Sequence, residues 1–334
     1  MIIHEGFKDI KVTLIGCVGN DLAREVYNFG RLSHDYIEPL PEEYDENNPE
    51  CIKLIDKIIA GRTLPKYALQ GHRLDFRIEK ISRICLAQLT RDTAIFASQG
   101  GGVFPLTQEL NLPLSITQHE DVMEMVKSAQ RILEQAYITL AKREVPALEA
   151  RYIGLHSQVI SLTASYLPSD FVRSCWSRTN SNFCDECNYV YRKMYHEVQK
   201  MIAGLTDKNS IRLWGWLINE NNCMNDKPYN RESLYNSDFN FSKKDVVEVR
   251  PAINDWRKSG WKLELERMFH EEPELLTIDE MQRIQNWKSM EAAGVELPTS
   301  YDNTRNDVLC NAIEQMDYYK EYVEYINKAA EELE

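Results

Sequence analysis

Residues 71–104, GHRLDFRIEKISRICLAQLTRDTAIFASQGGGVF, are the stretch that decides the fold. Residues 73–78 predict a strand. The side chains that follow recur at spacings of three and four, as on one buried face of a helix: Ile78, Ile81, Cys85, Gln88 and Leu89. Residues 98–102 then form a glycine-rich segment. We therefore expect a strand, a helix and a glycine-rich loop in succession.

Two polar side chains lie near the end of the predicted helix. Gln88 and Arg91 are three residues apart and so share a face. Arg91 is suited to pair with a phosphate or with a pyrimidine carbonyl, although the alternative is a solvated surface arginine. The amide of Gln88 both donates and accepts hydrogen bonds, which suits the edge of a base. From the residues alone, both a substrate contact and a solvated helix end fit this pair, and Gln88 by itself indicates little.

The glycine-rich segment consists of Ser98, Gln99, Gly100, Gly101 and Gly102. Successive glycines can adopt positive φ angles and direct several backbone N–H groups at one point. Such an arrangement binds anions, phosphate above all. The alternative is a plain turn between a helix and a strand, which an isolated glycine triplet favours. The segment matches neither the Walker pattern nor the dinucleotide-binding pattern.

Further candidates are scattered more widely. Arg178 and Arg192 lie fourteen residues apart and could both face an anion if the segment folds back, or could be solvated charges on helices. A lone histidine such as His72 is more often structural than catalytic. Cys184 and Cys187 have the spacing of half a zinc site. No second pair with matching spacing accompanies them, so we predict no metal site.

The composition is that of a globular chain with an acidic surface. The 334 residues carry a net charge of −13, with 43% hydrophobic and 27% charged residues. An acidic balance argues against a nucleic-acid or membrane partner, since both favour a basic face. No apolar run approaches the ~20 residues of a membrane span, and no secretion signal is visible. Eight scattered cysteines fit free thiols. We expect a cytoplasmic protein.

Periodicity predicts the remaining elements. A strand is expected over residues 8–17, and Thr117-x-x-Glu120 and Thr277-x-x-Glu280 resemble capping boxes at helix starts. Helices are expected over residues 21–32, 51–60, 120–140, 183–203, 256–269, 277–293 and 306–332. Residues 219–240 are rich in asparagine and predict a long loop. The texture changes after Gly204, so we predict one domain over 1–205 and a mostly helical extension over 206–334.

Several segments, taken together, resemble the flavin-dependent (ThyX-type) thymidylate synthases. IKVTLIGCVGNDLAREVYNFGRL (10–32) is similar to the family's opening strand and helix, and LDFRIEKISRICLAQLTR (74–91) to its "FTF-x-I-x-x-ISR-x-x-x-x-Q-x-x-R" unit. Glu149-Ala150-Arg151-Tyr152 looks like its "DARY" segment. Arg178 falls at an arginine that precedes the family's "AQWEIR" helix, and Arg192 within that helix. The resemblance covers about residues 8–205.

The chain departs from the family at its signature, R-H-R-x-x-S-x-x-x-x-S-x-R-Y. Only the first arginine is kept, as Arg91. Asp92 and Thr93 stand where the family has the histidine and second arginine that meet the flavin. The two serines, the last arginine and the tyrosine are replaced by Phe96, Gly101, Val103 and Phe104. The positive charge expected beside a flavin is therefore reduced, while the backbone N–H groups of the glycine loop could still hold a phosphate.

The resemblance implies an α+β fold with a mixed or antiparallel sheet and long helices. It implies a pyrimidine-nucleotide C5 methyl- or hydroxymethyltransferase that binds a dUMP-like substrate, with FAD as cofactor and NADPH and methylenetetrahydrofolate as co-substrates. Arg91 and Gln88 would act on the nucleotide, Arg178 and Arg192 would help to bind it, and Arg91 and His72 would contact the flavin. It also implies a homotetramer. A relative with a changed cofactor or substrate, and a binding or structural protein without catalysis, are the alternatives.

Overall fold

The computed structural model describes residues 1–34, 40–59, 72–92, 94–99, 109–179, 184–215 and 261–294. The chain divides into two compact units, Met1–Asn286 and Trp287–Glu334. The first unit includes residues 206–286, which the sequence analysis assigned to the C-terminal extension. The predicted domain boundary at residue 205 stays a prediction.

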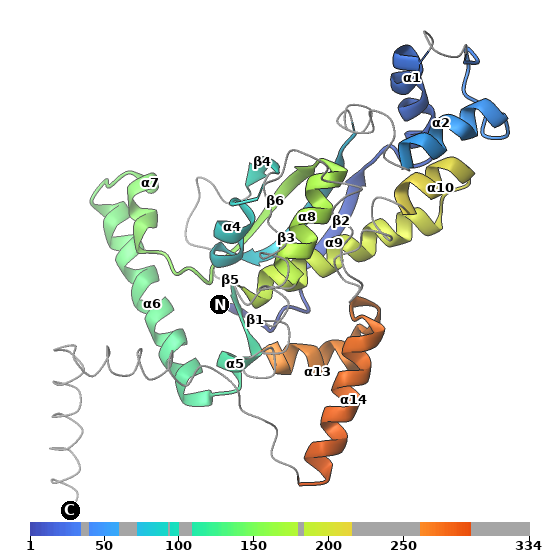
Figure 1. The fold of residues 1–334 in the computed structure, drawn as a ribbon. Coiled ribbons are helices and arrows are strands. Elements are labelled where there is room, and N and C mark those ends of the chain that lie inside the picture. The colour runs from blue at the N-terminus through green and yellow to red at the C-terminus, as the bar shows by residue number, and fades with distance from the viewer. Residues whose placement is uncertain are drawn as a thin grey trace, which may run out of the picture. The chain divides into compact units, whose positions relative to one another are not determined.

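Two sheets form the β part of the fold (Figure 1). The larger sheet is antiparallel throughout and has the order β2 (Lys11–Gly16), β3 (Leu74–Ser82), β6 (Val159–Tyr166), β4 (Ile95–Gln99). The smaller one is a parallel pair, β1 (Ile2–Glu5) and β5 (Glu109–Leu112). With the helices below, the architecture is α+β, as predicted. The central strand β6 was not predicted from the sequence.

Helices make up most of the rest. The α-helices are α1 (Leu22–His34), α2 (Pro49–Ile59), α4 (Arg83–Leu89), α5 (Leu114–Thr117), α6 (Glu120–Lys142), α7 (Ala147–Ala150), α8 (Pro168–Thr179), α9 (Asp185–Ala203), α10 (Lys208–Trp214), α13 (Trp261–Glu271) and α14 (Ile278–Ala292). Short 3₁₀ helices are η1 (Gly19–Asp21), η2 (Arg151–Ile153) and η5 (Pro273–Leu275). Most predicted helices therefore exist, with shifted ends.

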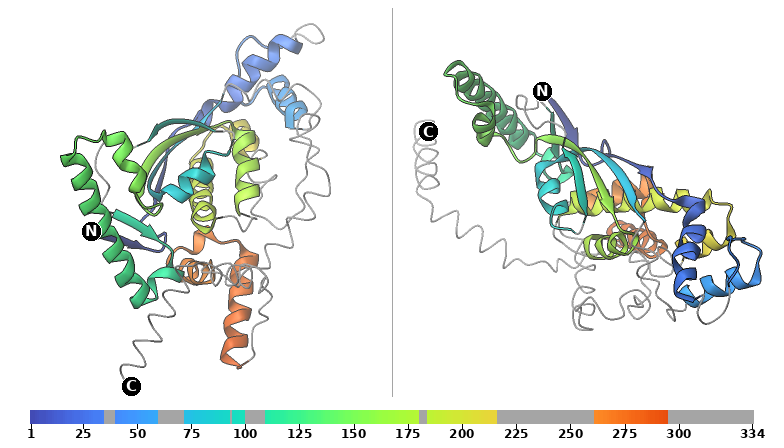
Figure 2. Two further views of the ribbon diagram at one scale, coloured as in Figure 1. Left: turned by 90° about the vertical axis from the view of Figure 1, so that its left-hand side faces the viewer. Right: turned by 90° about the horizontal axis from the view of Figure 1, so that it is seen from above.

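The core lies between the larger sheet and α9, which packs against β2 and β3 (Figure 2). Four aromatic rings join the elements here. Phe76 of β3 stacks on Phe171 of α8 at 5.3 Å between centroids, and Tyr166 of β6 meets Phe171 and Tyr191 edge to face. Aromatic contacts of this kind add to the burial of large apolar surfaces. The cluster fixes α8 and α9 against the strands that precede the predicted site.

The first prediction that fails is the start of helix α4. The helical spacing predicts Ile78 and Ile81 on the helix, but strand β3 continues to Ser82 through an irregularity at Lys80, whose φ is +65°. Helix α4 begins only at Arg83, and the Ser82 side chain caps it by accepting from the N–H of Cys85 at 3.1 Å. Pairing with β6 outweighs the local helical spacing.

A buried carboxylate holds the end of β3. Glu186, in the first turn of α9, accepts hydrogen bonds from the N–H of Ser82 (2.6 Å), from the Ser82 hydroxyl and from Nδ2 of Asn111 (2.9 Å). Burial raises the pKa of Glu186 to about 7. The donors are neutral, so the carboxyl connects β3, β5 and α9 without an ion pair to offset its burial.

The two capping-box patterns have different outcomes. Thr277 and Glu280 form the reciprocal bonds, with the N–H of Thr277 donating to Glu280 Oε2 at 2.9 Å and the N–H of Glu280 donating to Thr277 Oγ1 at 3.2 Å. The capping box predicted at Thr117 is wrong, because Thr117 is the last residue of α5 and His119 is the N-cap of α6. Helix α14 is followed by Gly294 at φ +70°, a conformation that glycine adopts without strain at a helix end.

Several predictions fall outside the described residues. These are the structure at Gly100–Gly102, the loop over 219–240, the start of the helix expected at 256 and the helix over 306–332. Among the described helices, none is long and apolar enough to cross a membrane. The expected cytoplasmic location stays a prediction.

Candidate functional site

The site predicted from the sequence begins at the end of α4. The helix stops after Leu89, and the N–H groups of Arg91 and Asp92 donate to the carbonyls of Gln88 (3.2 Å) and Leu89 (3.0 Å). Gln88 is half-buried and Arg91 is exposed. These last bonds fix the backbone that carries all three polar side chains, since the final carbonyls of a helix otherwise have no partner. Gln88 and Arg91 therefore lie next to each other at one helix end.

Arg178 of α8 reaches the same place through Asp92. Its Nε and Nη2 both donate to Asp92 Oδ1, at 3.1 and 2.7 Å. The two side chains are 14% and 7% exposed, so this is a largely buried ion pair. Burial alone would lower the pKa of Arg178, but the hydrogen bonds to Asp92 and its charge raise it. Arg178 is charged, and Asp92 neutralises it.

A line of hydroxyl groups leads away from Asp92 into the core. The hydroxyl of Tyr191 donates to Asp92 Oδ2 and lies 2.9 Å from the hydroxyl of Tyr166. Burial first, and then the charges around it, raise the pKa of Tyr191 well above its ordinary value, so it keeps its proton. Because Tyr191 gives that proton to Asp92, Tyr166 must donate to Tyr191. Asp92 is thus held by three donors from α8 and α9.

The glycine-rich segment is only partly within the described residues. Ser98 and Gln99 belong to strand β4, where they pair with Thr163 and Leu162 of β6. The sequence predicts both residues in the loop, and this prediction is wrong, because pairing with β6 extends the strand through them. Gly100, Gly101 and Gly102 lie outside the described residues. The predicted phosphate cradle stays a prediction.

His72 lies in the core just ahead of β3. Its side chain is buried, and its Nδ1 is 2.9 Å from Oε2 of Glu25 on α1. A histidine enclosed against α1 is placed to join two elements rather than to meet a ligand. The proposed contact with a flavin has no support in this position.

Arg192 is used within the protein. Its Nη1 and Nη2 donate to the two oxygens of Glu280 at 2.8 and 2.6 Å, and its Nε donates to Oδ1 of Asn188 at 2.7 Å. Nη1 also donates to the carbonyl of Leu275 at 3.0 Å. A guanidinium forked onto a carboxylate in this way fastens α14 to α9. Arg192 is therefore left out of the site proposed below.

Of the positions predicted to meet a flavin, Arg91 is exposed, but Asp92 and His72 do not fit one. At the position where the family has a histidine, Asp92 offers a carboxylate already bonded to Arg178 and Tyr191, and His72 is enclosed. Neither supplies the positive charge or the free donor that an anionic cofactor would need. Among the described residues, no group of three or more His, Cys, Asp or Glu side chains could hold a metal ion.

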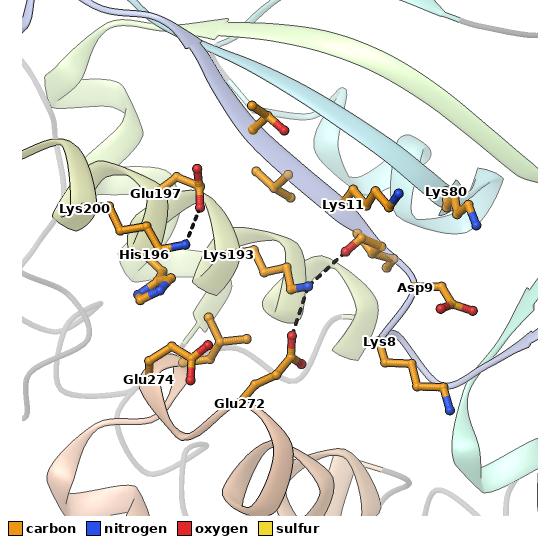
Figure 3. Close-up of a pocket in the computed structure, with 14 residues that line it drawn as sticks. Lys8, Asp9, Lys11, Lys80, Lys193, His196, Glu197, Lys200, Glu272 and Glu274 are labelled. Carbon is orange, nitrogen blue, oxygen red and sulfur yellow. Dashed lines mark hydrogen bonds and ion pairs between the residues drawn. The ribbon is translucent and has the colours of Figure 1, made fainter.

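A cavity of about 580 Å³ lies elsewhere, between β2, α9 and η5, and includes none of the predicted site residues (Figure 3). Its wall carries five lysines: Lys8, Lys11, Lys80, Lys193 and Lys200. Sequence reasoning missed it because these lysines come from three separate elements. Asp92 was also missed as a partner of Arg178, since no spacing connects residues 86 positions apart.

Comparisons with known proteins give distant structural likenesses. No protein-family model and no curated protein matches the chain. Among solved structures, it is similar to a UMP/dUMP methylase, PolB, from Streptomyces cacaoi bound with 5-Br dUMP, at 16% identity and a TM-score of 0.47, over 60% of this chain and 93% of that one. It is also similar to thymidylate synthase X from Helicobacter pylori with FAD and dUMP, at 15% identity and a TM-score of 0.43, over 61% and 99%. At these TM-scores and identities, neither likeness establishes what this chain binds or which reaction it catalyses.

Proposed function

We propose that the chain is an enzyme that binds a pyrimidine nucleotide at the end of α4 and transfers a one-carbon unit, methyl or hydroxymethyl, to C5 of its base. One observation carries this proposal. The ion pair between Asp92 and Arg178 brings together two segments that the sequence resemblance assigns independently to a nucleotide site, Gln88–Arg91 and the end of α8. Those segments are 86 residues apart in the chain, so their meeting is not a consequence of local sequence.

Each residue of this proposed site has a distinct role. Gln88 would bond the edge of the base with its amide, which can donate and accept. Arg91, exposed at the helix end, would supply the positive charge for an anionic group. Arg178 makes no hydrogen bond through Nη1 among the described residues, so those two N–H groups would be directed at a carbonyl of the base. Asp92 positions Arg178, and the backbone of Gly100–Gly102 would hold the phosphate.

The sequence resemblance also implies FAD, NADPH and methylenetetrahydrofolate. Reduced flavin would supply the reducing equivalents for such a transfer when bound, and the folate its one-carbon unit. Because Asp92 and His72 do not fit a flavin, the proposal involves no step through it. The absorption spectrum of the purified protein shows directly whether a flavin is bound, since a bound flavin gives a yellow protein.

Nucleotide binding tests the proposed site. We expect dUMP or UMP to bind the full-length chain in a calorimetric titration, and Arg91→Ala to weaken that binding at least tenfold, because it removes the exposed cation. Arg131→Ala is the matched control, as it removes an equally exposed arginine from α6. An Arg91→Ala variant that binds both nucleotides as well as the parent protein would place the site elsewhere.

A second candidate is an enzyme of the same fold with a changed cofactor or substrate. Asp92 favours it, because a buried carboxylate replaces a histidine at the position that resembles the flavin contact. Such a protein would be stabilised by a pyrimidine nucleotide in a thermal melt without taking up FAD. A protein that takes up FAD and oxidises NADPH in the presence of dUMP would instead support the first reaction. Absence of any response to nucleotides would leave a structural role.

We further propose that the chain forms a homo-oligomer through α6. Val122, Met125, Ala129 and Ile132 share one face of this helix and are exposed, with Met125 and Ile132 each 64% exposed. An apolar helix face of this kind is typical of a contact surface. Ile132→Glu is expected to lower the mass measured by sedimentation, while Gln135→Glu, also exposed on α6, leaves it unchanged. A monomeric parent protein would contradict the proposal.

A further inference from the structure

The cavity between β2, α9 and η5, called the lysine pocket below, shares no residue with the proposed nucleotide site. It is lined by five lysines and His196, and by four carboxylates, Asp9, Glu197, Glu272 and Glu274. Its volume of about 580 Å³ lies in the range of small-molecule sites, roughly 300–1,000 Å³. The balance of charge in its wall depends on which of these groups are already paired.

Two of the lysines are engaged with carboxylates. Lys193 Nζ lies 3.1 Å from Glu272 Oε1 and donates to the carbonyl of Ile10 at 3.0 Å. Lys200 Nζ donates to Oε1 of Glu197 at 2.8 Å. Figure 3 shows both extending from α9 toward these partners. These pairs close one side of the pocket and contribute little net charge.

The other three lysines are not balanced in this way. Lys8, Lys11 and Lys80 have no ion pair among the described residues, and Figure 3 shows them around Asp9, on the side away from α9. Asp9 itself is bonded to Nδ1 of His4 at 2.7 Å. This hydrogen bond lowers the pKa of Asp9, and the charges of His4, Lys80 and Lys8 lower it further. The balance at this end is positive.

The backbone at Lys80 is itself unusual. Its φ of +65° lies in the left-handed region, where a residue with a Cβ costs about 1–2 kcal/mol. Nδ2 of Asn111 holds it by donating to its carbonyl at 3.2 Å. Strained residues of this kind cluster at functional sites. The irregularity that interrupts β3 therefore sits at the wall of the pocket.

We propose that this pocket is a binding site for a polyphosphate group. Lysine binds phosphate as a point charge, and three such charges suit a ligand with several phosphates better than a single one. The chain carries a net charge of −13, so it repels anions at long range. Binding here consequently depends on the local lysines and not on the general field of the protein. The site is separate from Gln88, Arg91 and Arg178.

The test is a calorimetric titration of the full-length protein with inorganic tripolyphosphate. We expect saturable binding, weakened at least tenfold by the double variant Lys11→Gln and Lys80→Gln. The matched control is Lys127→Gln with Lys142→Gln, which removes two charges from α6 and is expected to change the affinity less than twofold. Lys8→Gln, at an exposed turn, is a second variant in case the double variant does not fold, and should weaken binding about threefold or more.

Three results would overturn the proposal. They are no saturable binding to the parent protein, an equal loss in the control double variant, and a loss in Arg91→Ala that the lysine variants do not show. The last result would place the phosphates in the proposed nucleotide site, so the two proposals can fail separately. A parallel titration with a nucleoside triphosphate distinguishes the source. Affinity tenfold above that of tripolyphosphate assigns the pocket to a nucleotide, and equal affinity assigns it to the phosphates alone.

Discussion

The arginines of the predicted site and the lysines of the pocket differ in how their charge is balanced. Arg178 and Arg192 are buried and fork onto Asp92 and Glu280. Lys8, Lys11 and Lys80 line a cavity without an ion pair among the described residues. A planar guanidinium suits a bidentate, desolvated partner, whereas an ammonium group is strongly hydrated. Arg178 and Arg192 therefore join elements of the fold, whereas Lys8, Lys11 and Lys80 are available for the ligand proposed above.

The largest expected effect concerns the buried pair at the proposed site. Asp92→Ala leaves the charge of Arg178 buried and the Tyr191 hydroxyl without its acceptor, so we expect it to lower the free energy of unfolding by about 3–5 kcal/mol. Urea denaturation measures this change. Asp21→Ala removes an exposed pair with Arg24 and should lower it by less than about 1 kcal/mol. Similar losses of unfolding free energy in Asp92→Ala and Asp21→Ala would mean that the buried pair stabilises the fold no more than an exposed one.

Glu186 differs from Asp92, because the groups that donate hydrogen bonds to this buried carboxyl are neutral. Its pKa is about 7 when folded and 4.5 in the unfolded chain. The unfolded chain therefore loses its proton first, so this group stabilises fully below about pH 4.5 and loses that contribution as the pH rises to about 7. The difference of about 2.5 units corresponds to a loss on the order of 3 kcal/mol. We expect Glu186→Gln to reduce the decline in stability measured between pH 5 and 7.5.

Asp185 also has a pKa raised by burial, to about 6, and will keep part of the decline in the variant. A stability profile that is identical in Glu186→Gln and the parent protein would therefore mean that Glu186 ionises normally. The Ser82 and Asn111 donors would then be satisfied by a permanently charged group.

The smallest expected effect is at Lys80. Lys80→Gly relieves the positive φ angle, so we expect a gain of up to about 1 kcal/mol in stability together with weaker tripolyphosphate binding. Glu144→Gly is the matched control, since Glu144 has φ +60° but lies at the end of α6. It should gain stability without any change in binding. If both glycine variants bind tripolyphosphate as the parent does, Lys80 is not part of the site.

What the sequence could predict was local in origin. Thr277 and Glu280 form a capping box because the pattern and the helix lie within four residues of each other. The same spacing at Thr117 fails because the chain makes a separate short helix before α6. The α+β class and most helices followed from periodicity. Capping and helical periodicity both depend on residues that are close together in the sequence.

What could not be predicted depends on distant partners. The end of β3 is a strand and not a helix, because β6 pairs with Ile81 and Ser82 and Glu186 bonds to Ser82. The roles of Asp92 and Arg192 follow from partners 86 and 88 residues away. No spacing in a single sequence encodes such pairs. For the same reason, Arg192 was assigned to a substrate although Glu280 occupies it.

The most direct test of the central claim is a crystal structure of the full-length protein with dUMP and inorganic tripolyphosphate. We expect the base beside Gln88 and Arg91 with Arg178 Nη1 in contact, and the tripolyphosphate between Lys8, Lys11 and Lys80. A nucleotide found in the lysine pocket, with the end of α4 empty, would contradict the assignment of the two regions.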